Sequence, residues 1–163
     1  MSASHRSARH LQLAAAAVIA SVGFAATAQA GSCPADKQVE AGKGQPMSQA
    51  AAKAVTDNVL TVIDLSKEAA AIPDRHLRLR RLVVQPGGVV PWHSHGERPA
   101  LIYIVSGDIT EYASNCAVPI LHRAGEAAQE SHGLAHWWKN TGTVPAVLIS
   151  ADFFPVKHDP HMM

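Results

Sequence analysis

Two histidines stand two residues apart in the segment Pro86-Gly-Gly-Val-Val-Pro-Trp-His93-Ser-His95. Successive side chains on an extended strand alternate between its two faces, so His93 and His95 point to the same side. Further along, the chain reads Gly133-Leu-Ala-His136-Trp-Trp-Lys-Asn140. If a strand carrying His136 lies across from the histidine pair, three neutral imidazoles converge on one point and can bind a metal ion.

Short apolar runs separated by turn residues predict an antiparallel all-β protein. The runs expected to form strands cover residues 60–64, 77–85, 100–105, 109–113, 119–122 and 146–154. Turns that contain glycine are expected between them, at 86–88, 106–108, 124–126 and 140–142. A turn roughly every ten residues is typical of a sandwich or a small barrel.

The first thirty residues predict a secretory signal peptide. Arg6 and Arg9 precede an apolar run over residues 11–26, and Ala28-Gln-Ala30 follows as a cleavage site. We expect cleavage after Ala30 and a mature protein that is periplasmic or secreted. Two alternatives stay open, namely that the apolar run is kept as a membrane anchor and that Cys33 carries a lipid.

The remaining residues, 31–163, are enough for one domain. Without Arg6 and Arg9, twelve basic residues stand against thirteen acidic ones. This balance provides no positive excess for binding phosphate groups. We therefore expect no nucleic-acid partner and, once the signal peptide is removed, no membrane partner.

Cys33 and Cys116 are the only cysteines in the sequence. In an oxidising compartment they can form a disulfide, which would stabilise the fold by about 3–5 kcal/mol in the chain-entropy description. Their spacing alone does not decide between a disulfide and two separate thiols. A thiol count on the unreduced protein distinguishes the two.

Both histidine segments resemble sequence motifs of the cupin superfamily. Residues 87–107 read Gly-x5-His-Ser-His-x11-Gly and resemble the first motif. Residues 125–140 read Gly-x5-Ser-x-Gly-x2-His-x3-Asn and resemble the second. The resemblance implies a double-stranded β-helix, a jelly-roll barrel with a transition metal in its mouth. The implied ligands are His93, His95 and His136.

A change at Val59, from a stretch rich in Gly, Ala, Lys and Gln to short apolar runs, sets the expected start of the domain. A cupin barrel is expected over residues 59–157, preceded by a partly ordered arm over 31–58. The arm has a weak helical pattern around residues 47–55. Residues 158–163 are expected to be a frayed tail.

The chain departs from the first motif at one ligand position. Cupins usually have a glutamate separated from the second histidine by three or four residues, and this chain has Pro99 and Ala100 at those positions. Glu97 is the nearest carboxylate, and it is either a fourth ligand or a solvated side chain paired with Arg98. A three-histidine site is the other option. Imidazoles with or without a carboxylate suit iron, manganese, nickel, zinc or copper, without choosing among them.

Four more residues are candidates for substrate binding or for support of the ligands: His132, Trp138, Arg98 and Tyr103. His132 precedes His136 in a loop, where it can carry protons. Trp138 shares a face with His136 and either walls a pocket or fills the barrel core. Arg98 either recognises a substrate carboxylate from the rim or is a surface charge.

Two functions of different kinds follow from the resemblance. A metalloenzyme would use the open positions of the ion for a dioxygenase, isomerase or lyase type of reaction on a small molecule. A non-catalytic module would bind a small molecule or a metal without transforming it. A purely structural role, through pairing of barrel edges into a homodimer, is a third alternative. The other strand histidines, His76 and His122, are expected to be ordinary polar residues.

Overall fold

The computed structural model describes residues 31–156, so the predicted signal peptide over 1–30 and the tail over 158–163 lie outside the described residues. Almost all regular structure in 31–156 is strand, which confirms the predicted all-β class. Two single-turn 3-10 helices are η1 (Ala35–Lys37) and η2 (Leu65–Lys67). The strands are β1 (Lys53–Asp64), β2 (Arg75–Ser94), β3 (Ala100–Ser106), β4 (Asp108–Ala113), β5 (Ile120–Arg123), β6 (Ala127–Glu130), β7 (Ala135–Lys139) and β8 (Ala146–Pro155).

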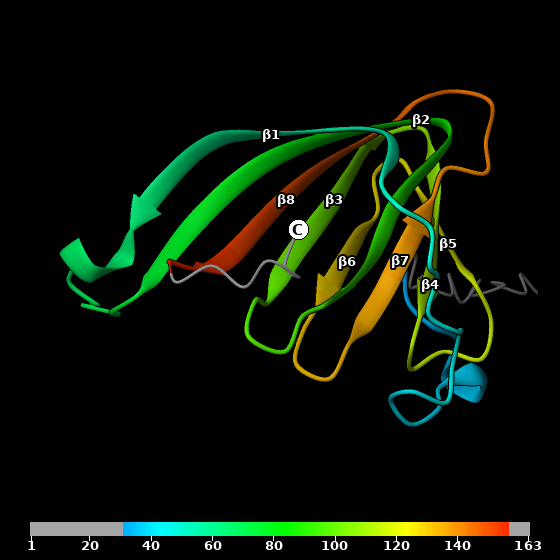
Figure 1. The fold of residues 1–163 in the computed structure, drawn as a ribbon, viewed down its shortest axis with the longest axis horizontal. Coiled ribbons are helices and arrows are strands. Elements are labelled where there is room, and N and C mark those ends of the chain that lie inside the picture. The colour runs from blue at the N-terminus through cyan, green and yellow to red at the C-terminus, as the bar shows by residue number, and fades with distance from the viewer. Residues whose placement is uncertain (1–30, 157–163) are drawn as a thin grey trace, which may run out of the picture.

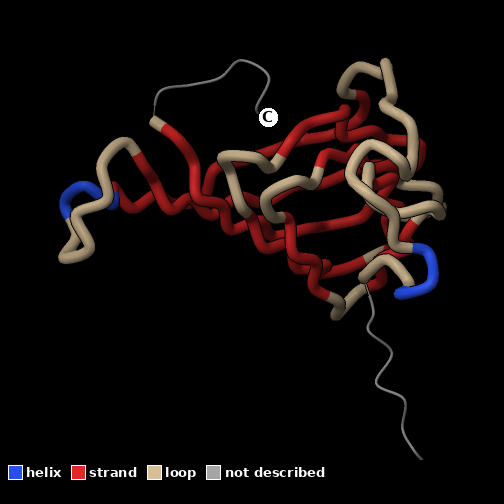
Figure 2. Tube along the Cα trace, turned by 90° about the horizontal axis from the view of Figure 1, so that it is seen from below, coloured by secondary structure: helices blue, strands red, loops and turns tan. Residues whose placement is uncertain are grey.

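The strands form one antiparallel sheet that curls into a nearly closed barrel (Figure 1). Its order is β5-β4-β7-β2-β8-β3-β6, and β1 pairs with β2 outside this path. The turn between β5 and β6 bonds to Ile104 of β3, which brings the two ends of the sheet together. This topology is that of the predicted double-stranded β-helix. The long strands β1, β2 and β8 project beyond the barrel at the left of Figures 1 and 2.

Strand β2 joins the two parts of the molecule. Its first half pairs with β1 and β8, and its second half pairs with β7. The turn predicted at residues 86–88 is wrong, because β2 runs through it without a break. Gly87 has φ +73°, and a side chain on Gly88 would lie 2.7 Å from the Gln85 carbonyl oxygen. The glycines therefore allow a bend inside a strand.

The barrel interior is a hydrophobic core. Its buried members include Leu82, Val84, Val90, Ile102, Ile104, Ile109, Trp138 and Leu148, and along β3, β7 and β8 they alternate with more exposed residues. Such period-two burial matches the alternating apolar pattern of the predicted strands. A second, smaller cluster of buried apolar residues comprises Ala113, Cys116, Ile120 and Leu134.

The N-terminal arm over residues 31–58 contains η1 and the first part of β1. No helix forms over residues 47–55, and β1 already begins at Lys53, because pairing with β2 outweighs a weak local helical pattern. A disulfide joins Cys33 of the arm to Cys116, and Gln38 forms an isolated β-bridge with Cys116. Among the residues described, no helix is long and apolar enough to cross a membrane.

Candidate metal centre

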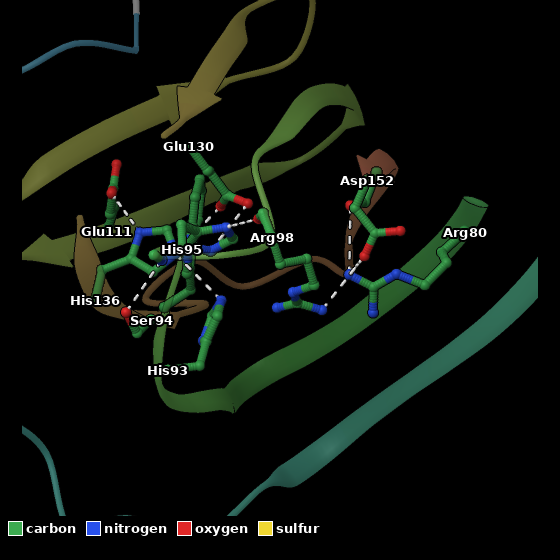
Figure 3. Close-up of polar contacts among 12 residues, drawn as sticks. Arg80, His93, Ser94, His95, Arg98, Glu111, Glu130, His136 and Asp152 are labelled. Carbon is green, nitrogen blue, oxygen red and sulfur yellow. Dashed lines mark hydrogen bonds and ion pairs between the residues drawn. The ribbon is translucent and has the colours of Figure 1, made fainter. Parts of the chain in front are cut away.

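Four buried side chains converge on one point inside the barrel (Figure 3). His93 lies near the end of β2, His95 follows that strand directly, His136 lies on β7, and Glu130 ends β6. In the sheet, His93 is the register partner of His136. One ligand atom from each of the four residues lies within 4.8 Å of the others. The structure thus brings together the three predicted histidines and adds a carboxylate.

The distances within this group fit a shared ion. Nε2 of His136 lies 3.0 Å from Nε2 of His95 and 3.2 Å from Nε2 of His93. The Glu130 carboxylate places one oxygen 3.2 Å from Nε2 of His95 and the other 3.2 Å from Nε2 of His136. Two donors that bind one ion at about 2.1 Å and about 90° lie about 3.0 Å apart. The donor set and its spacing therefore match a transition-metal site.

The hydrogen bonds on the far side of each ring fix the tautomers. Nδ1 of His93 lies 2.9 Å from the Pro91 carbonyl oxygen, and Nδ1 of His95 lies 2.8 Å from that of Arg98. Nδ1 of His136 lies 2.5 Å from a carboxylate oxygen of Glu111. Carbonyl oxygens only accept, so the facing Nδ1 atoms donate. In the neutral rings, each Nε2 then carries a lone pair directed at the centre of the group. Three converging lone pairs repel one another unless a cation lies between them.

Without a metal ion, this cation is a proton on His136. Burial lowers the pKa of His93 to about 3, and it also lowers the pKa of His95. Burial opposes a charge on His136 as well, but the carboxylates of Glu130 and Glu111 outweigh it and raise the pKa of His136 to about 9. His136 in turn outweighs the effect of burial on Glu130 and lowers the pKa of that carboxyl to about 2.

Glu111 orients His136 from β4. It is buried, and its second oxygen lies 2.8 Å from Nε2 of His122. Burial raises the pKa of Glu111, but hydrogen bonds from His122 and His136 outweigh it and lower this pKa to about 2. Sequence reasoning missed this residue. The sequence gives one indication of its role. Glu111 stands two residues from Ile109 and from Ala113 on the same strand, so its side chain faces inward as theirs do.

Glu97 does not join the metal group. Its side chain is exposed in the turn after β2, where strand alternation no longer applies. Glu130 supplies the carboxylate instead. This residue was missed because the sequence of β6, Ala-Ala-Gln-Glu, has little strand character. Its position immediately before Ser131 of the second motif is the signal that could have found it.

The other candidate residues lie in different surroundings. Arg98 is buried rather than at the rim, 1% exposed, with Nη1 3.3 Å from the carboxylate of Asp152. Trp138 both packs in the core and lines the pocket described below, with its indole nitrogen 3.3 Å from Nε2 of His136. His132 is exposed, and its Nδ1 lies 3.2 Å from the Gly96 carbonyl oxygen. Tyr103 is half exposed and does not line this pocket.

A pocket adjoins the metal group inside the barrel. His93 and Glu130 form part of its wall, so a ligand in the pocket would contact the same side chains that surround the ion position. Two arginines also line it. The remaining wall is largely apolar and is contributed by Val55, Leu82, Val90, Ile102, Trp138 and Leu148.

Comparison with known proteins agrees with this geometry. Residues 80–152 match the family model described as "Cupin domain". Nectarin-1 of Nicotiana langsdorffii x Nicotiana sanderae is 32% identical over 76 residues, which are 45% of this chain and 33% of that protein. Nectarin-1 of Nicotiana plumbaginifolia is 30% identical over the same coverage. The matched segment thus spans about a third of the length of these curated relatives.

Among solved structures, an uncharacterised protein of Klebsiella pneumoniae with a double-stranded β-helix domain has a similar fold. The superposition has a TM-score of 0.50 and covers 72% of this chain and 87% of that chain. The sequences are 17% identical, so this likeness concerns the fold alone.

Proposed function

Because this chain belongs to the cupin superfamily, we propose that it is a metal-binding cupin in which His93, His95, His136 and Glu130 hold one divalent transition metal ion. The observation that carries the proposal is the convergence of three Nε2 atoms whose rings are fixed by acceptors at Nδ1. When bound, the ion would supply Lewis-acid or redox chemistry to a small molecule. Iron, manganese, nickel, zinc and copper all accept such ligands.

We further propose that the protein is a small-molecule enzyme of the dioxygenase, isomerase or lyase type. The pocket beside the metal group favours this activity over a non-catalytic binding module, because His93 and Glu130 face a ligand that enters it. Trp138 and the apolar wall exclude water from that ligand. Glu130 places a negative charge beside the ion position, and Glu111 holds the His136 ring in one orientation.

Metal analysis of protein purified without added metals or chelating resin tests the proposed centre. We expect close to one ion per chain in the natural protein and background metal in His136→Ala. His132→Ala is the matched control, because His132 lies in the turn just before β7 but is exposed and outside the ligand group. Unchanged metal in His136→Ala would refute the ligand assignment.

We also propose that the protein is exported, with cleavage after Ala30. The disulfide between Cys33 and Cys116 supports this proposal, because structural disulfides persist in oxidising compartments. Mass spectrometry of the protein from its natural cell fraction tests it. The expected mass is that of a chain beginning at Gly31 with both cysteines oxidised, and a retained leader would contradict the proposal.

A further inference from the structure

The pocket beside the metal group is lined by two buried guanidinium groups. Arg98 is 1% exposed and Arg80 is 6% exposed. Figure 3 shows Arg98 between the histidine group on one side and the pair formed by Arg80 and Asp152 on the other. A charged side chain is rarely this buried unless a partner compensates its charge.

The protein's own carboxylates do not compensate this charge fully. Asp152 accepts from Arg78 through two bonds of 3.0 and 2.7 Å, and it also lies 3.3 Å from Arg98 and 3.4 Å from Arg80. Asp57 of β1 forms a second ion pair with Arg80. Three guanidinium groups thus share two carboxylates. Glu130, the other carboxylate in the pocket, belongs to the metal group.

Two donors of these arginines also lack an acceptor. The Nε atoms of Arg80 and Arg98 are buried, and neither has a hydrogen-bond partner among residues 31–156. Buried donors without acceptors are costly, and the planar guanidinium fork matches a carboxylate. An anion in the pocket would compensate the unmatched charge and would offer acceptors to the guanidinium groups that carry these donors.

The pocket also limits the size of this anion. Its volume is about 40 Å³, which suits a small ligand. Arg80 and Arg98 line it together with His93 and Glu130. A ligand with few heavy atoms can therefore contact an arginine and a residue of the metal group at once.

We propose that Arg80 and Arg98 form an anion subsite that binds the carboxylate of a small organic acid, with the rest of the acid directed toward His93 and Glu130. Only the position of the far end of the acid rests on the proposed metal function. The contact between the arginines and the carboxylate does not require a metal ion.

Asp57 acts as an internal competitor for the subsite. Its side chain also lines the pocket, and it is 31% exposed while the Arg80 side chain that it pairs with is 8% exposed. Removing its charge frees Arg80 for the ligand. We therefore expect Asp57→Asn to bind small acids more tightly than the natural protein does.

Calorimetric titration of the folded mature protein with acetate, pyruvate and acetamide tests the subsite. We expect both carboxylates to bind, and we expect the neutral acetamide to bind at least about tenfold more weakly because it lacks the charge. Arg98→Gln and Arg80→Gln should each weaken acid binding by about tenfold or more. Arg81→Gln is the matched control, because Arg81 is an exposed arginine of the same strand and does not line the pocket. We expect acid affinity in this control to stay within about twofold.

The outcomes separate the subsite from the metal centre. Acetamide binding equal to that of acetate, or an equal loss in Arg81→Gln, overturns the subsite. Metal content is measured in the same samples. Bound metal without acid binding overturns the subsite and leaves the metal centre standing. Arginine-dependent acid binding without bound metal supports the subsite and overturns the metal centre. Asp57→Asn keeps both arginines, so unchanged or weaker acid binding in this variant counts against the subsite even if an arginine variant fails to fold.

Discussion

His93 and His136 lie directly opposite each other on β2 and β7, and their Nε2 atoms are 3.2 Å apart. This pairing is a register relationship between two strands that are distant in the sequence. A bulge between Val90 and His93 sets the register at this point. The same pairing that builds the sheet therefore also builds the ion site.

Glu130→Gln should weaken metal binding by about tenfold or more, because it removes the carboxylate that faces two ligand nitrogens. Glu97→Gln is the matched control, with an exposed side chain close in the sequence to His95. Competition titration against a metal-binding dye measures both variants. Equal losses in the two would mean that Glu97 takes part in binding.

Glu111→Gln should lower metal affinity about 10- to 100-fold although Glu111 is not a ligand. Its carboxylate fixes the tautomer and the orientation of the His136 ring, and the amide replaces it with a neutral group. Glu126→Gln, in the turn between β5 and β6, should leave the affinity unchanged. An unaltered affinity in Glu111→Gln would show that the ring is held by packing alone.

Metal binding should release about one proton near neutral pH. The metal-free His136 has a pKa of about 9, so it is protonated below that pH and the ion must displace the proton. Apparent affinity should rise about tenfold per pH unit up to about pH 9 and then level off. Calorimetry in two buffers of different ionisation enthalpy measures the proton count. No proton release at pH 7 would contradict this protonation state.

The metal-free protein should lose stability when the pH falls from about 6.5 toward 3. The pKa of His93 is lowered to about 3 in the folded state, so the unfolded chain takes up this proton at higher pH than the folded protein does. Glu130 and Glu111 have pKa values lowered from 4.5 to about 2. They add to the loss of stability as the pH falls from about 4.5 toward 2. Urea unfolding midpoints at pH 4 and pH 7 measure it. A higher midpoint at pH 4 would be inconsistent with a buried neutral His93.

Reduction of the disulfide between Cys33 and Cys116 should lower the free energy of unfolding by about 3–5 kcal/mol. The bond closes a long loop, with a sequence separation of 83 residues, and attaches the arm to the barrel. Unfolding is compared with and without reductant. The double variant Cys33→Ser with Cys116→Ser serves as the control, and its stability should not respond to the reductant.

Local patterns predicted the fold class and the three histidines. Alternation alone places His93 and His95 on one face, and the second motif identifies His136. Glu130 and Glu111 were not predicted, because their roles depend on which strands become neighbours in the barrel. Arg98 turns inward just after β2 ends, where alternation gives no information. Gly87 and Gly88 predict a turn, but the structure has a bend within a strand there. Glycines favour both, so the sequence does not distinguish them.

The length and continuity of β2 have a consequence for ligand choice. Arg80 and His93 belong to this one strand, so the spacing between the anion anchor and the ion position is set by a single backbone segment. No flexible loop separates them. The protein should therefore bind acids of one chain length more tightly than shorter or longer ones. A change in the curvature of the strand at Gly87 would alter which chain length fits best.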